Sequence, residues 1–172
     1  MDETEFWAIV DSSREAAEGD PEEQADALVD RLVLLDPDSV VDFARHFESR
    51  LGRSYRWDLW GAARLLLGSA SDDAFDNFRC WLIGQGRHVF ESALHEPDDL
   101  AELLDDFDEE LDGDAEDLGY AAYEAYEQLT GMELPDLELP EQPEEPAGTP
   151  VGLDDPKALA ERFPELTDRF GS

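Results

Sequence analysis

Helix-start signals recur along this chain and constrain its fold more than any other feature. Asp20-Pro21 and Asp36-Pro37 each place an N-capping acid before a proline, a residue that suits the first position of a helix. Ser71 precedes Asp72-Asp73 in a similar way, and a helix favours negative charge in its first turn. Apolar residues follow these signals at helical spacing, and no useful stretch of β-alternation appears. We therefore expect an all-α fold.

The helical periodicity divides the chain into three parts. Residues 1–130 predict a compact orthogonal bundle of about seven to eight helices. Residues 131–153 are acidic and rich in proline, which is typical of an extended, solvated linker. Residues 154–172 regain apolar residues and positive charge at helical spacing, although Pro164 should break or kink that helix. We expect this last segment to fold back as a clasp on the domain, which carries an acidic stripe around Asp105, Asp106 and Glu109.

The most unusual bulk property is a net charge of −34, from 12 basic and 46 acidic residues. Such a field repels nucleic acid and anionic membranes, so neither is an expected partner. No apolar run reaches the length of a membrane span, and the first residues are acidic, so we expect a cytoplasmic protein. Cys80 is the only cysteine, which excludes an internal disulfide or a cysteine-based zinc site. Nothing in the sequence indicates an oligomeric state.

Residues 53–90 form a locally basic, aromatic centre that contains three of the four tryptophans and five arginines. Arginine offers a planar fork to phosphate or carboxylate and stacks on aromatic rings, so this centre is a candidate anion pocket. The simpler interpretation, which we favour, is that these arginines neutralise the protein's own carboxylates. The candidate ligand or partner surface comprises Arg53, Arg56, Trp57, Asp58, Trp60, Arg64, Asp72, Asp73, Arg79, Trp81 and Arg87.

Three other acidic or histidine patterns predict no chemistry. Asp72 and Asp73 point about 100° apart on a helix, which is poor geometry for sharing a proton. His88 and His95 are two turns apart, about 10 Å, too far to share one metal ion readily. Residues 108–114 resemble the first half of a calcium loop, but glycine stands where the bidentate glutamate is required. We therefore predict no catalytic residue, metal or cofactor.

Two runs in the aromatic centre carry a family resemblance. WDLWGAARLLLG and SDDAFDNFRCWLIGQGR are similar to the signature of the bacterial domain-of-unknown-function family 4240, also found in actinobacteria. Its members share W-D-L-W-G-A-A and S-D-D-x-F-x-x-F-R-x-W-L-I-x-Q-G runs, with glycine often standing where this chain has Ala74. The likeness covers roughly residues 1–130 and implies that domain's boundaries. The family has no assigned activity, so the resemblance leaves function open.

Two functional hypotheses follow. The first is a non-catalytic interaction or regulatory module that binds a basic or arginine-presenting partner protein, because an acidic surface speeds encounter with such a partner. The second is an enzyme or small-molecule-binding protein that uses the Trp, Arg and Asp centre, residues 53–90, against an anionic ligand. We favour the first because the sequence shows no set of nucleophile, base and oxyanion donor. An open cleft lined by the tryptophans would favour the second.

Overall fold

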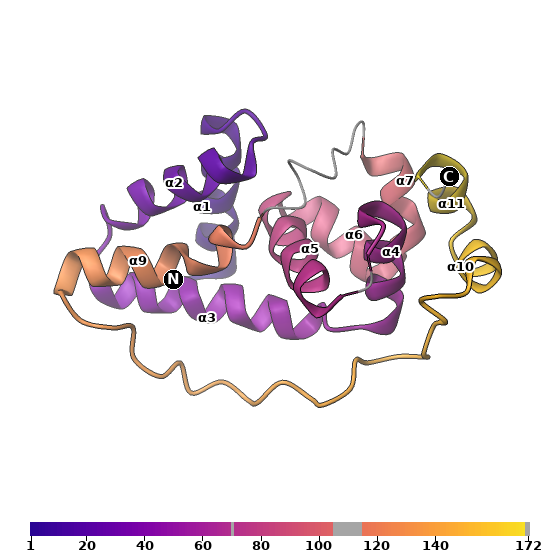
Figure 1. Ribbon diagram of the computed structural model, residues 1–172. Coiled ribbons are helices and arrows are strands. Elements are labelled where there is room, and N and C mark those ends of the chain that lie inside the picture. Colours follow the sequence, from indigo (N-terminus) through magenta and orange to yellow (C-terminus); the bar gives the residue numbers. More distant parts are fainter. Residues whose placement is uncertain (70, 105–114, 171–172) are drawn as a thin grey trace.

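The computed structural model describes residues 1–69, 71–104 and 115–170, and across them it confirms an all-α fold without strands (Figure 1). The described residues form ten α-helices and a 3-10 turn, more than the seven to eight helices expected. The excess lies near the C-terminus, where Pro164 separates two short helices. The elements are α1 (Glu3–Ala16), α2 (Pro21–Leu32), α3 (Pro37–Arg53), α4 (Trp57–Leu67), α5 (Asp72–Gly84), α6 (Arg87–His95), η1 (Pro97–Asp99), α7 (Leu100–Leu103), α9 (Asp117–Thr130), α10 (Pro156–Arg162) and α11 (Pro164–Phe170).

Three helices begin where the sequence predicts, and each of these starts has its side-chain cap. Asp20 Oδ1 accepts from the backbone N–H of Glu22 at 3.0 Å, and Asp36 Oδ1 accepts from Ser39 N at 2.9 Å. Ser71 Oγ accepts from Ala74 N at 3.1 Å. These bonds satisfy backbone donors that the first turn of a helix leaves without a partner.

Helix α3 is the longest described element, and α9, α5 and α1 pack against it (Figure 1). Helices α2 and α9 lie side by side over one half of α3, and α1 packs against α2. Helices α4, α5 and α6 gather near the other half. Five fully buried phenylalanines fill the space between these groups: Phe6, Phe43, Phe75, Phe78 and Phe90. One continuous core therefore joins elements from both halves.

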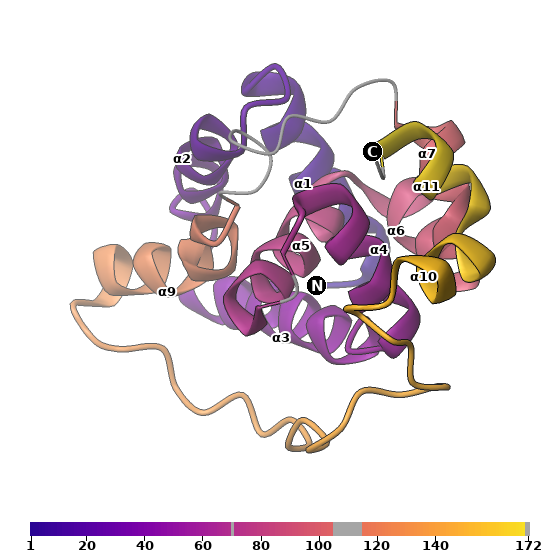
Figure 2. The same cartoon turned by 45° about the vertical axis from the view of Figure 1, so that its right-hand side comes forward.

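The chain after α9 runs as an extended segment past α3 and then forms α10 and α11 (Figures 1 and 2). Helix α11 packs against α4, η1 and α7, and the side chains of Phe163 and Leu166 are buried. The acidic residues on which we expected this segment to dock, Asp105, Asp106 and Glu109, lie outside the described residues. The acidic turn at 108–114 does as well. Within the described ranges, no helix combines the length and apolar character needed to cross a bilayer.

A candidate binding cleft beside helix α3

Four of the five arginines of the predicted centre face carboxylates of the same chain. Arg56 Nε lies 3.1 Å from Asp58 Oδ1, and Arg79 Nη2 lies 2.5 Å from Asp76 Oδ1. Arg53 pairs with Glu91 at 3.2 Å and Arg87 pairs with Glu3 at 3.6 Å. Arg64 is half-buried on α4 and makes no ion pair within the described residues. The geometry thus agrees with arginines that neutralise their own protein.

The three tryptophans of the centre lie in two different environments. Trp57 and Trp60 are half-buried and stacked, with ring centroids 5.6 Å apart, and Trp60 also stacks on Phe75 at 4.7 Å. Trp81 is only 2% exposed and stacks on Phe78 inside the core. None of the three lines the cleft described below. Their main visible role is packing.

Asp72 and Asp73 are exposed in the first turn of α5, beside the Ser71 cap. Arg79, which lines the cleft described below, follows Asp72 and Asp73 on α5 by about two helical turns, roughly 10 Å along the helix axis. The structure therefore does not bring these two aspartates into the cleft.

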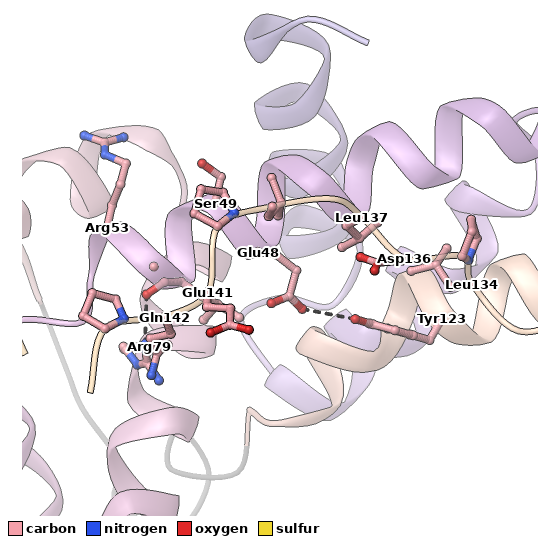
Figure 3. A pocket seen from close by; sticks show the side chains of 16 residues that line it. Glu48, Ser49, Arg53, Arg79, Tyr123, Leu134, Asp136, Leu137, Glu141 and Gln142 are labelled. Atoms are coloured by element: carbon pink, nitrogen blue, oxygen red, sulfur yellow. Dashed lines mark hydrogen bonds between the residues drawn. The ribbon is translucent and has the colours of Figure 1, made fainter. Parts of the chain in front are cut away.

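A cleft of about 780 Å³ lies between α3, α9 and an extended segment, residues 134–143 (Figure 3). Of the predicted surface it contains Arg53 and Arg79. Its principal polar residues besides these are Glu48 from α3, Tyr123 from α9 and Gln142 from the extended segment. The sequence did not single out these three, because they come from distant parts of the chain.

Arg79 forms one fixed wall of the cleft. Its guanidinium lies over the rings of Tyr55 and Phe75, at 5.1 Å and 4.9 Å, and the residue is only 4% exposed. Nη1 donates to the carbonyl of Leu51 at 2.9 Å and to Gln142 Oε1 at 3.4 Å. A buried guanidinium with this many contacts is held in one position, so it can direct a donor at an oxygen acceptor.

Glu48 is the half-buried carboxylate of the cleft, and it points toward Tyr123 (Figure 3). The Tyr123 hydroxyl donates to Glu48 Oε1 at a long 3.5 Å. Burial raises the pKa of Glu48 above its usual value, and burial together with the Glu48 charge raises the pKa of Tyr123. A partly desolvated carboxylate with one weak donor favours the approach of a cation or a further donor. A neighbouring cavity of about 270 Å³ shares Glu48 and Arg79 and adds Glu116 and Tyr120.

Next to the cleft, the solvent-exposed side of α9 carries two tyrosines among carboxylates. Tyr120 and Tyr123 are 57% and 40% exposed, which is unusual for large aromatic side chains. Carboxylates surround them, and the Tyr120 hydroxyl donates to Glu116 Oε1 at 3.3 Å. We call the exposed residues of this side the α9 face: Glu116, Tyr120, Tyr123, Glu124 and Glu127.

The single thiol and the histidine and acidic side chains bear on nucleophilic and metal chemistry. Cys80 is buried, and burial raises the pKa of its thiol to about 12, so the thiol stays protonated near neutral pH. Among the residues that the structure describes, no group of three or more His, Cys, Asp or Glu side chains could hold a metal ion.

Comparison with known proteins gives one match. The model of a family described as "Protein of unknown function (DUF4240)" matches residues 1–128. No curated protein and no solved structure matches the chain. The matched region contains α3 and α5 and most of α9, whereas the extended segment that borders the cleft lies beyond it.

Proposed function

We propose that this chain, which belongs to the DUF4240 family, is a non-catalytic interaction module that binds a basic partner protein in the cytoplasm through the α9 face. The observation that carries the proposal is the pair of exposed tyrosines, Tyr120 and Tyr123, among carboxylates on one side of a helix. Tyrosine rings attract guanidinium and ammonium groups, and neighbouring carboxylates add charge-assisted hydrogen bonds. Arginine side chains fit such a surface best, because they can stack on the ring and bond a carboxylate at once.

Two features support this choice. The net charge of −34 steers a basic partner toward the protein and raises the association rate. Glu48 lies beside the Tyr123 hydroxyl and offers a partly desolvated carboxylate to a side chain that extends along the ring. The alternative, an anionic ligand held by the arginine centre, has less support because four of those arginines already face carboxylates.

The test is a titration of the full chain with a fluorescently labelled arginine-rich peptide, followed by anisotropy. The variant Tyr120→Ser/Glu124→Gln/Glu127→Gln removes a ring and two charges from the α9 face. Its control, Asp26→Asn/Asp30→Asn, removes two exposed charges from α2. We expect the α9 variant to weaken binding about tenfold or more, the scale of losing one interface anchor, and the control to change it much less. Equal weakening by both variants would mean that net charge alone attracts the peptide and would overturn the proposal.

A further inference from the structure

The extended segment at 134–147 lies along the domain and contacts it at three places. Arg45 Nε donates to the carbonyl of Leu137 at 3.2 Å, and Arg79 Nη1 donates to Gln142 Oε1. Further along, Ala147 pairs with the chain before α4 as a strand would: Ala147 N donates to Tyr55 O at 2.9 Å, and Trp57 N donates to Ala147 O at 3.0 Å. The domain thus binds oxygen atoms and extended backbone of this segment.

Side-chain burial along the segment is sparse. Leu134 and Leu137 are half-buried against the core, and Pro146 is buried. The acidic and proline residues between them are exposed, and Leu139 is 37% exposed. The 780 Å³ cleft separates much of this stretch from α3 and α9. Because few apolar contacts hold it, this stretch should open at a lower free energy than the helical core.

Both ends of the stretch are anchored independently of its middle. Gly131 ends α9 in a left-handed conformation, and its N–H bonds the carbonyl of Glu127. At the other end the Ala147 pair is followed by α10 and α11, which are docked through Phe163 and Leu166. The residues between these anchors can therefore leave α3 while both anchors stay in place.

We propose that residues 133–146 are a removable internal ligand, and that the surface beneath them binds extended, proline-rich acidic segments of other chains. We call this surface the α3 groove and define it by Arg45, Leu51 and Arg79. Its two arginines donate to uncharged oxygens of the segment, the Leu137 carbonyl and Gln142 Oε1, while they also pair with Asp42 and Asp76 of the domain. Tethering gives the internal segment an effective concentration of roughly millimolar, so weak contacts are enough to keep it bound.

The recognition mode depends on backbone more than on side chains. An extended segment with regularly placed prolines is already partly ordered, so it loses little conformational entropy on binding. Leu134 and Leu137 supply apolar contacts to the core, and Arg45 fixes the register by its bond to a main-chain oxygen. The groove lies within the family-matched residues, while the segment that occupies it does not.

The first experiment exchanges residues 133–146 for a glycine-serine sequence of equal length and leaves Ala147 and the two C-terminal helices unchanged. A labelled peptide of residues 133–146 is then titrated into this variant and into the natural chain at moderate salt, which screens repulsion from the acidic body. We expect saturable binding to the variant and at least about tenfold weaker binding to the natural chain, whose groove is occupied. The affinity of the glycine-serine variant for the peptide should fall when Arg45→Gln is added. It should stay unchanged when Arg14→Gln is added, because Arg14 is an exposed residue of α1.

A peptide in which both leucines at 134 and 137 are serine has the same charge and should bind much more weakly. No saturable binding to a folded glycine-serine variant, or equal binding to both proteins, would overturn the proposal.

If the glycine-serine variant does not fold, a second experiment tests the proposal by amide hydrogen exchange of the full-length Leu134→Ser/Leu137→Ser variant. Exchange should then become about tenfold faster at residues 136–142 and stay unchanged at Phe43 and Phe47 in α3. Equal acceleration in α3 would show that the segment is part of the core and would contradict a removable ligand.

Discussion

The ring of Phe163 lies so close to Gly61 that a β-carbon at residue 61 would come within 2.5 Å of Phe163 Cε2. Because residue 61 has no side chain, the Phe163 ring of the C-terminal segment can pack directly against α4. Phe163 is 1% exposed there, so the contact joins the last two helices to the domain core.

Gly61→Ala should destabilise the protein by roughly 1–3 kcal/mol, because the added methyl forces the Phe163 ring to move. The usual gain of helix propensity, about 1 kcal/mol, works against this loss. Gly52→Ala is the matched control: a β-carbon added there would meet no atom within 4 Å, so propensity alone should stabilise it. Denaturant unfolding of both variants measures the difference. Stabilisation of similar size in both would contradict the Phe163 contact.

Asp98→Ala should lower stability by about 1–2 kcal/mol, the usual effect of losing a helix cap. The Asp98 carboxylate accepts from the backbone N–H of Leu166 at 2.9 Å and of Glu165 at 3.2 Å, at the start of α11. Asp99→Ala is the control, because both of these bonds to α11 belong to its neighbour Asp98. The readout is the thermal melt together with amide exchange at Leu166, which should lose protection only in the Asp98 variant.

Trp81→Ala should cost about 3–5 kcal/mol, as expected for a fully buried aromatic side chain. Trp60→Ala should cost less, roughly 2–3 kcal/mol, because Trp60 is half-buried and its place in the stack is partly open to solvent. Urea unfolding of the two variants provides the comparison. A near-neutral Trp60→Ala would indicate a tryptophan available for binding rather than packing.

Glu48→Gln should stabilise the protein near neutral pH. The folded pKa of Glu48 is raised by burial, so the folded state prefers the protonated form and the ionised carboxylate lowers stability. This unfavourable contribution is full above the raised folded pKa and disappears as the pH falls below the usual value of 4.5. The stabilisation by Gln should therefore shrink between neutral and acidic pH. Exposed Glu127→Gln is the control, and a pH-independent effect of Glu48→Gln would refute this linkage.

Moderate salt should stabilise the natural chain, because screening reduces repulsion among 46 acidic residues. A gain of about 1 kcal/mol would raise Tm by roughly 2–4 °C in a chain of this size. Melts in sodium chloride from low to moderate concentration test this. Glucose at equal osmolarity serves as the uncharged control, and a Tm that is flat or falls with salt would oppose the prediction.

The sequence by itself determined the helices, because their signals are local. Asp20, Asp36 and Ser71 cap donors no more than three residues away, so their chemistry can be read without any tertiary contact. The bounds of α4, Trp57–Leu67, follow in the same way from a mostly apolar run, interrupted by Asp58 and Arg64, that ends at Gly68. The two tryptophan-rich runs also indicated the family that the comparison then showed.

Only the tertiary structure decided which side chains meet. Glu48 and Tyr123 are 75 residues apart in the chain, and Arg79 and Gln142 are 63 apart, so no local spacing could pair them. Composition likewise could not distinguish Trp81, inside the core, from Trp57 and Trp60 in their half-buried stack. Helix formation depends on neighbours in sequence, whereas a cleft depends on how whole helices pack, and that arrangement is set by the summed contacts of the core.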